Sequence, residues 1–209
     1  MFVNFTLAKA QLNRHIIDTI RYDLKQSKKL YVSLDFKNTF VSDLSTKMFG
    51  LQLGYIFNKR TSLYIGYYGA NKASKVVANP TALQGKTDSN TMYQNYGLNY
   101  FNVGIDYIFY NSKRWRFSIP LSVGKGTGYS QLSTQKNTFA TTKTNVVPFE
   151  FALYGSYKIT WWLWFGAGMG SRIILNNKSG YNGTFYSIGL QLKTGEIYRR
   201  TKNFIKEKF

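Results

Sequence analysis

The sequence predicts an all-β protein, an eight-stranded antiparallel up-and-down transmembrane β-barrel with a short N-terminal amphipathic helix and a basic C-terminal tail. The first observation behind this prediction is an alternation of two kinds of side chain. In residues 115–124, Trp, Phe, Ile, Leu and Val take the odd positions, while Arg, Ser, Pro and Gly take the even ones. One apolar face and one small or polar face are typical of a strand between lipid and a barrel lumen.

The second observation is the composition. Aromatic residues make up 18% of the 209 residues, and aromatic side chains favour strands and membrane interfaces. The hydrophobic content of 44% is too high for a disordered chain, and the length suits one domain. The absence of cysteine excludes disulfides and Cys-ligated metal sites.

The third observation is that apolar runs are short. The longest run, residues 161–170, is about half of the roughly 20 residues that a spanning helix needs, and Ser171 and Arg172 end it. The chain can therefore cross a bilayer only as a barrel.

Residues 1–10 read as the remnant of a signal peptide. A short apolar stretch precedes Ala8-Lys9-Ala10, an A-x-A pattern that predicts cleavage after Ala10. A basic first region and a longer apolar core are missing, so we expect the true start upstream of Met1. The alternative is an ordinary frayed terminus.

Residues 11–28 predict an amphipathic helix, because apolar residues recur there at three- and four-residue spacing with basic residues opposite. We expect this helix in the periplasm, either in the inner-leaflet interface or packed on the barrel rim. Its candidate residues for docking onto a partner or a lipid are Ile16, Ile20 and Leu24.

Residues 29–194 predict the barrel, with eight strands placed by the parity of their apolar positions. Pro120 interrupts one of them and would need a bulge, because proline removes a ladder donor. The apolar faces are found in residues 30–36, 49–57, 63–67, 101–109, 115–123, 149–157, 161–169 and 186–192.

Connection lengths support the strand count. Short turns are expected at residues 58–60, 111–114 and 159–160, and long loops at 38–47, 70–92, 128–145 and 176–183. Short turns at one end and long loops at the other are typical of outer-membrane barrels.

In these features the chain resembles the small eight-stranded outer-membrane β-barrel proteins of Gram-negative bacteria. Its Tyr-, Asn- and Lys-rich composition resembles the versions found in Bacteroidota. The resemblance implies location in the bacterial outer membrane, periplasmic turns, extracellular loops and both termini in the periplasm. One feature departs from it: members commonly end on an aromatic residue of the last strand, but here the apolar face stops at Leu192 and residues 195–209 follow.

A soluble eight-stranded barrel such as a lipocalin is the structural alternative. It would expose the polar face of each strand to water. That face carries Gly and Ser instead of many Lys and Glu, and small residues suit a crowded lumen. The pattern therefore favours the membrane barrel.

Charged residues on the lumen face predict a structural salt-bridge network, because buried charges persist when they are paired. An ion path is the alternative, but an eight-stranded lumen is filled by side chains. The predicted network consists of Asp35, Lys37, Asp106, Arg116, Glu150, Lys158 and Arg172.

Aromatic residues near the strand ends predict a band at the membrane interface. The candidates are Tyr55, Phe57, Tyr107, Phe109, Trp115, Tyr157 and Trp161.

The formal net charge of +19 raises the possibility of nucleic-acid binding. The basic residues, however, concentrate in predicted turns, loops and tails. Anionic lipid headgroups and lipopolysaccharide phosphates attract Lys and Arg at both interfaces. We therefore expect outer-membrane lipids, including lipopolysaccharide, as partners, and no nucleic acid.

The sequence offers no catalytic constellation. The only histidine, His15, lies in the predicted N-terminal helix with Asp18 three residues later, and no nucleophile accompanies the pair. We expect no catalytic, cofactor-binding or metal-binding residues and no cofactor. A lipid-modifying enzyme remains the alternative that replacing His15 would test.

Residues 195–209 form a basic tail, expected in the periplasm, in which cationic and apolar residues are interleaved. Its candidate docking residues are Arg199, Arg200, Lys202 and Phe204. The predicted function is that of a non-enzymatic barrel with a filled lumen, acting as an accessory or structural subunit of a larger outer-membrane protein complex. The alternative is a free-standing structural or adhesive barrel that binds through its extracellular loops.

Overall fold

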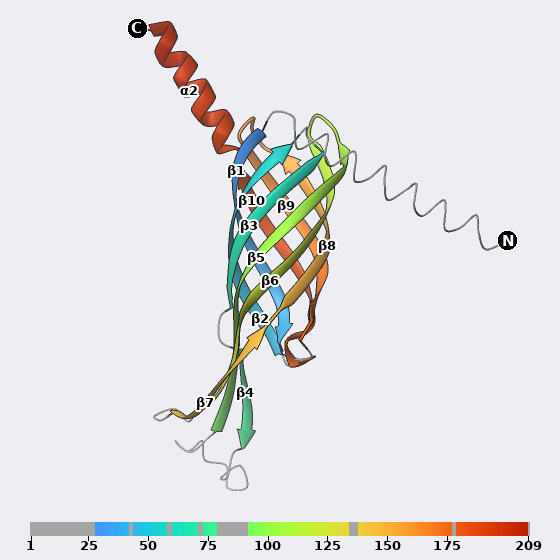
Figure 1. The fold of residues 1–209 in the computed structure, drawn as a ribbon, viewed down its shortest axis with the longest axis vertical. Helices are drawn as coiled ribbons and strands as arrows, with labels where there is room; N and C mark the ends of the chain where they lie inside the picture. Colours follow the sequence, from blue (N-terminus) through green and yellow to red (C-terminus); the bar gives the residue numbers. More distant parts are fainter. Residues whose placement is uncertain are drawn as a thin grey trace, which may run out of the picture.

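Long antiparallel strands, most of them steeply tilted, make up most of the computed structural model (Figure 1). The structure describes residues 28–41, 44–57, 60–70, 73–78, 92–133, 138–176 and 179–208. The elements are β1 (Lys28–Val41), β2 (Leu44–Phe57), β3 (Thr61–Ala70), β4 (Ala73–Ala78), β5 (Met92–Asn111), β6 (Trp115–Ser133), β7 (Thr138–Val146), β8 (Pro148–Lys158), β9 (Leu163–Ile174), the 3-10 turn η2 (Ser179–Tyr181), β10 (Gly183–Leu192) and α2 (Thr194–Lys208).

Eight of these strands close into a barrel. Each pairs antiparallel with its neighbours in the order β5-β3-β2-β1-β10-β9-β8-β6, and β6 pairs back with β5. The first and last strands of the chain meet in the wall, with Val32 opposite Leu192 and Thr39 opposite Phe185. The predicted eight-stranded antiparallel barrel is confirmed.

The remaining strands, β4 and β7, flank the ends of β5 and β6, and the four together form a sheet that continues beyond one rim of the barrel (Figure 1). The first residues of β5 pair with β4, and the last residues of β6 pair with β7. The predicted loops at 70–92 and 128–145 are thus partly strand, which corrects the prediction. Outside lipid a strand needs no apolar alternation, and the Thr-rich segment that forms β7 has high strand propensity.

A third predicted long loop is also wrong. Strands β1 and β2 pair up to Val41 opposite Leu44, so residues 38–41 and 44–47 belong to a tight hairpin. The short turn predicted between the fourth and fifth strands is confirmed, because β5 ends at Asn111 and β6 begins at Trp115. The turn predicted at 159–160 extends to residue 162, because β9 begins at Leu163, and the turn at 58–60 lies partly outside the described residues.

Apolar side chains point outward and polar side chains point inward, which is the reverse of a protein folded in water. Phe101 is 68% exposed and Ile65 58% exposed, whereas Glu150 is 5% exposed and Arg172 1% exposed. Such an exposed apolar belt around a polar interior is the arrangement of a barrel surrounded by lipid. The soluble-barrel alternative is therefore excluded.

Tyrosine rings lying on glycines of neighbouring strands fill much of the lumen. A Cβ atom at Gly54 would meet the Tyr31 ring at 2.6 Å, and one at Gly189 would meet the Tyr154 hydroxyl at 2.6 Å. The Tyr154 ring also covers Gly166 and Gly168. Glycine is required at these positions because no side chain fits between the ring and the opposite backbone.

Apolar clusters lie at both ends of the lumen. Tyr31, Ile56, Tyr64 and Ile108 form one near the short turns. At the opposite end the larger cluster consists of Val41, Met48, Tyr68, Leu98, Tyr100, Val146, Ile174 and Tyr181.

Pro120 does not cause a bulge, contrary to the prediction. It pairs with Asp106 on β5, and toward β8 the ladder skips from Ser118–Tyr154 to Leu121–Phe151 without a change of register. Two missing pairs, at Ile119 and Pro120, and not an extra residue, accommodate the absent N–H.

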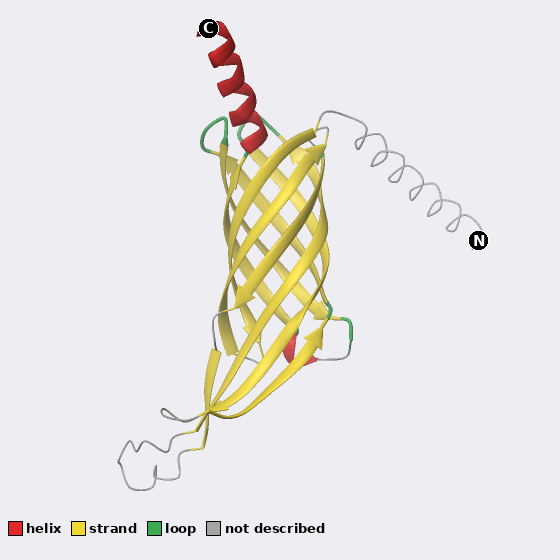
Figure 2. Cartoon of the chain, turned by 60° about the vertical axis from the view of Figure 1, so that its left-hand side comes forward, coloured by secondary structure: helices red, strands yellow, loops and turns green. Residues whose placement is uncertain are grey.

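The C-terminal tail is a helix. α2 begins two residues after β10 and projects away from the barrel at the end where the short turns lie (Figures 1 and 2). No helix in the described ranges is long and apolar enough to span a bilayer.

Candidate functional site

Glu150 on β8 is the centre of the buried charges in the lumen. Lys37 on β1 donates from Nζ to its Oε2 at 2.6 Å, and Tyr100 on β5 donates from Oη to its Oε1 at 2.5 Å. Arg172 on β9 lies 3.8 Å from Oε1. Three strands thus bring two cations and a hydroxyl to one carboxylate, which compensates the cost of its burial.

Arg172 also fixes the end of the lumen opposite α2. Its Nε donates to the carbonyl of Tyr181 in η2 at 2.9 Å. Its Nη2 donates to Thr39 Oγ1 at 3.2 Å and to the carbonyl of Phe40 at 3.0 Å. The guanidinium therefore ties β9, the η2 turn and β1 together beneath the larger apolar cluster.

Asp35 extends the same group toward the middle of the barrel. Tyr68 donates from Oη to Asp35 Oδ2 at 2.8 Å and accepts from Gln52 Nε2 at 2.7 Å. The Lys37 ammonium lies 3.8 Å from the centroid of the Tyr68 ring. Asp35 Oδ1 has no hydrogen-bond partner among the residues that the structure describes.

Asp106 and Arg116 form a second, separate group nearer to α2. Arg116 donates from Nη1 to Gln191 Oε1 at 3.0 Å and lies 4.2 Å from the ring centroid of Trp164. Within the described ranges no ion pair joins Arg116 to Asp106 at 4.0 Å or less. The charges that were predicted to form a single network therefore form two separate groups.

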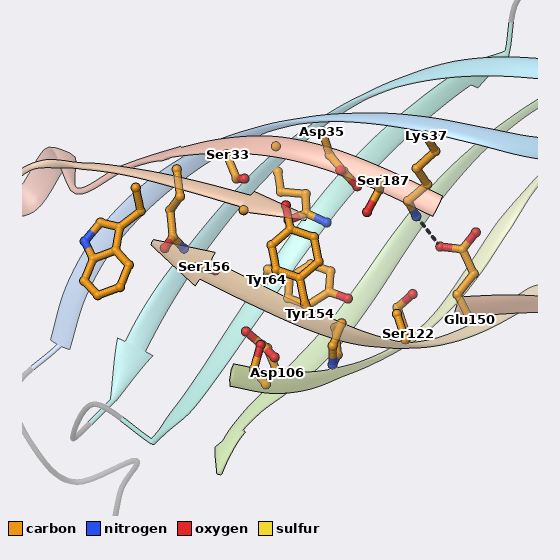
Figure 3. A pocket seen from close by; sticks show the side chains of 18 of the residues that line it. Ser33, Asp35, Lys37, Tyr64, Asp106, Ser122, Glu150, Tyr154, Ser156 and Ser187 are labelled. Atoms are coloured by element: carbon orange, nitrogen blue, oxygen red, sulfur yellow. Dashed lines mark hydrogen bonds and ion pairs between the residues drawn. The ribbon is translucent and has the colours of Figure 1, made fainter. Parts of the chain in front are cut away.

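Between the two groups lies a cavity of about 80 Å³. Tyr64 and Tyr154 lie in it between Asp35 and Asp106, and Lys37 points toward Glu150 (Figure 3). This volume holds a few water molecules, which suits the unpaired carboxylate oxygens on its wall. This cavity is small, so the buried charges around it do not line a wide aqueous path.

Lys158 does not belong to either group, which corrects the prediction. It is half-buried at the end of β8 and lines a second cavity at the α2 end, together with Trp161 and Lys193. Lys158 lies opposite the buried Trp164 in the ladder, so it faces inward as parity predicts, but it lies at the rim and outside both charge groups.

The predicted interfacial aromatics lie in one band at the α2 end, with two corrections. Tyr55, Tyr107, Phe109 and Trp115 are 43–50% exposed, and the half-buried Tyr157 packs edge-on against Trp115 at 4.9 Å. Phe57 is only 6% exposed, so it is not an exposed interfacial ring. Trp161 lies in the turn before β9, half-buried.

A second aromatic band, absent from the predicted set, lies toward the opposite rim. Phe36 contacts Phe49 at 5.2 Å between ring centroids, and Tyr67 contacts Phe101 at 4.7 Å. The signal for it was present, because all four belong to the apolar faces of predicted strands.

Contacts at its first turns anchor α2 to the barrel. Lys29 on β1 pairs with Glu196 at 2.7 Å. Arg200 lies 4.2 Å from the ring centroid of Trp161, and Lys193 lies 4.5 Å from that of Trp164. Burial opposes the charge of Glu196, but the Lys29 hydrogen bond and the nearby Lys193 together hold the pKa of Glu196 below its usual value.

The predicted docking residues divide into two sets. Arg199, Arg200 and Lys202 lie exposed on α2. Phe204 belongs to α2, but its side chain is outside the described part. The predictions for the N-terminus concern residues outside the described part. They are the signal remnant, the helix over residues 11–28 with Ile16, Ile20 and Leu24, and the pair of His15 and Asp18.

Within the described ranges, no three His, Asp or Glu side chains gather in a group that could hold a metal ion. The charged groups of the lumen are held by cations, tyrosines and amides, and none adjoins a histidine in these ranges. The site so described consists of two groups of buried charges inside a lipid-facing barrel.

Together, the closed eight-stranded wall, the apolar belt and the polar lumen define a transmembrane β-barrel of the outer-membrane class. No family model matches the sequence, and no curated protein matches it either.

One solved structure reaches a TM-score of 0.50 and shares the fold, and two others with lower scores are also similar. Neisserial surface protein A is similar, with a TM-score of 0.50 and 11% identity over 79% of this chain and 96% of that chain. The Yersinia pestis attachment invasion locus protein Ail, solved with the heparin analogue sucrose octasulfate, gives 0.48 and 8% over 79% and 96%. The N-terminal β-barrel domain of Pseudomonas aeruginosa OprF gives 0.46 and 10% over 80% and 97%. At these identities the likeness concerns the fold alone.

Proposed function

We propose that this protein is a non-enzymatic barrel of the bacterial outer membrane that serves as an accessory or structural subunit of a larger outer-membrane complex, with α2 as its docking element. The observation that carries the proposal is the exposed surface of an anchored helix. Tyr198 is 71% exposed and Ile205 53% exposed, beside the exposed cations Arg199 and Lys202. A rigid helix with exposed apolar and basic side chains suits a groove on a partner protein.

The shape of the molecule supports one orientation of the barrel in the membrane. Short turns and both ends of the barrel sequence lie at the α2 end, and the four-stranded extension lies at the other (Figure 2). In outer-membrane barrels short turns face the periplasm. We therefore place α2 in the periplasm and the extension outside the cell, with lipids that include lipopolysaccharide around the belt.

The filled lumen supports a structural role over conduction. A cavity of about 80 Å³ and two apolar clusters leave no wide passage for solutes. Three of the lumen charges are held in place: Lys37 and Glu150 pair with each other, and Glu150 and Asp35 accept hydrogen bonds from tyrosines.

The test is affinity purification of the tagged full-length protein from native outer membranes in mild detergent, with mass spectrometry of the eluate. A stoichiometric larger barrel or lipoprotein is expected with the natural sequence. Y198S/I205S is expected to lose this partner, and the matched control T201S, on the same helix, is expected to keep it. Recovery of the natural protein alone would overturn the subunit proposal. Electrophoresis with and without heating checks that each variant retains a folded barrel.

One observation favours a second function, that of a free-standing structural or adhesive barrel. Strands β4, β5, β6 and β7 form a sheet beyond the rim, which offers a surface for ligands outside the cell. Recovery of the protein alone, together with loss of surface adhesion when residues 138–146 are replaced, would support this alternative.

A further inference from the structure

At the α2 end the lumen opens into a cavity of about 300 Å³, which we call the vestibule. Strands β1, β5, β6 and β8, the turn before β9, and α2 all contribute to its wall. Its cationic side chains are Lys29, Lys113, Arg116, Lys158, Lys193 and Arg200, and its one carboxylate is Glu196.

The positive charge of the vestibule is not balanced by the described chain. Glu196 is already paired with Lys29 at 2.7 Å. Asp106, deeper in the lumen, acts electrostatically on Arg116 but forms no ion pair with it. No carboxylate in the described ranges lies within 4.0 Å of the amino groups of Lys113, Lys158 or Lys193. Such an excess of one sign in a concave, partly buried space attracts counter-ions strongly.

Two buried residues that line both the vestibule and the 80 Å³ cavity of the lumen carry donors without acceptors. Arg116 is 6% exposed and Trp164 is 3% exposed. Arg116 Nε and Trp164 Nε1 have no hydrogen-bond partner among the described residues. Buried donors are normally satisfied, and both of these can give a hydrogen bond to an acceptor but cannot receive one.

Aromatic rings hold the cations in place. The Trp164 ring lies between Arg116, at 4.2 Å, and Lys193, at 4.5 Å. Trp161 holds Arg200 at 4.2 Å. These cation–π contacts limit the motion of long side chains, so less rotamer entropy is lost when a ligand binds.

The pKa of Lys193 reflects the same excess of positive charge in the vestibule. Burial lowers the pKa of Lys193 to about 8, and the neighbouring Arg116 and Lys158 contribute in the same direction. The cations of the vestibule therefore repel one another in the absence of an anion.

We propose that the vestibule binds a phosphate-class oxyanion. A phosphoryl group carries close to two negative charges and three strong acceptor oxygens, and it suits several cations and N–H donors converging from different sides. A carboxylate offers half that charge. The guanidinium groups of Arg116 and Arg200 are of the kind that bind phosphate by paired hydrogen bonds. The phosphate can belong to a lipid headgroup that ends in a phosphomonoester at the membrane surface or to a soluble periplasmic compound.

The test uses the full-length protein in a non-ionic detergent free of phosphate. Inorganic phosphate is titrated calorimetrically, with chloride added to keep the ionic strength constant. Binding is expected for the natural sequence, and K193Q/R200Q is expected to bind roughly tenfold or more weakly, equal to at least about 1.4 kcal/mol. The matched control R199Q removes a charge of the same helix outside the vestibule, so its affinity is expected to stay within about twofold. Both variants spare the buried Arg116, so the barrel remains intact.

The source of the phosphate is distinguished by a second titrant, short-chain phosphatidic acid below its micellar concentration, whose headgroup is a phosphomonoester. Binding of both compounds identifies a lipid-headgroup site. Binding of inorganic phosphate without the lipid identifies a site for a soluble phosphate. Absence of binding by either compound, or an equal loss of affinity in R199Q and K193Q/R200Q, would overturn the proposal. None of these outcomes depends on whether α2 docks onto a partner protein.

Discussion

Lys37 and Glu150, 113 residues apart in the chain, form a 2.6 Å ion pair inside the barrel, with only 6% of each side chain exposed. The pair joins β1 to β8 across the lumen, because these strands are not neighbours in the wall. Tyr100 and Arg172 reach the same carboxylate from β5 and β9. A single acidic side chain therefore links four strands around the barrel.

Removing this carboxylate is expected to destabilise the barrel strongly. Glu150→Gln leaves two buried cations without their counter-charge, which costs about 3–5 kcal/mol when one partner of a buried pair is deleted. The measurement is urea unfolding of the protein in lipid vesicles. Glu196→Gln is the control, because that carboxylate lies at the partly exposed α2 anchor and its loss is expected to cost much less. Equal unfolding free energies for the two variants would contradict this role of Glu150.

The Tyr154 ring and Gly166 are expected to be coupled. Gly166→Val places a side chain where the Tyr154 ring lies, and the forced shift costs about 1–3 kcal/mol. In Y154A/G166V the ring is absent, so the second substitution is expected to cost far less than it does alone. A double-mutant cycle by urea unfolding measures the coupling. Additive free-energy changes would show that the ring does not fill the lumen in this way.

Oxyanion binding to the vestibule is expected to weaken as the pH rises through about 8, because the pKa of Lys193 is lowered to about 8 and its charge is lost above that pH. The groups that act on this amine are Arg116, Lys29 and Lys158, which oppose its charge, and Glu196, which favours it. Sulfate is the suitable probe, since it does not titrate in this range. Calorimetry between pH 7 and 9 is expected to show the loss in the natural sequence but not in K193Q. A profile shared by both proteins would assign the titration elsewhere.

A charged substitution in the lipid-facing belt is expected to cost the most folding free energy at the centre of the belt. Val103 is 56% exposed on β5, far from both rims, and Val103→Arg is expected to cost about 2–4 kcal/mol of folding free energy in vesicles. Tyr110→Arg, near the turn to β6, is expected to cost about 0–1 kcal/mol. Equal costs would place the belt at a different height on the barrel.

The local pattern of the sequence predicts the wall of the barrel well, because one face of every strand meets lipid and that face has to be apolar. Residues 115–123 illustrate this, since their odd positions are exposed and Arg116, Ser118 and Ser122 are buried as expected. Where the chain leaves the lipid the pattern stops being informative, so β4, β7 and the ends of β1 and β2 were mistaken for loops.

The candidate sites were predicted less completely, because they depend on which strands meet. Parity placed Lys37, Glu150 and Arg172 in the lumen but could not choose their partners among residues more than a hundred positions apart. It also missed the tyrosines, although Tyr64 and Tyr68 share the lumen face of β3. The vestibule gathers Lys29, Trp164 and Lys193 from three distant segments. Parity gives the inward direction of Lys158 but not its height, which is at the end of β8 beside the vestibule.

The pairing of β1 with β10 has a consequence for the order of assembly. This seam joins residues such as Ser33 and Gln191, and the chain between them contains every other strand of the wall. Contacts over so long a sequence separation are slow to form, and until they form both seam strands keep open edges that can pair with other chains. We therefore expect closure of this seam to be a late step of folding, and a chain cut short before Gly183 would lack the strand that completes the ring. Because α2 follows β10 by so few residues, the helix and the vestibule take their final shape only when the seam closes.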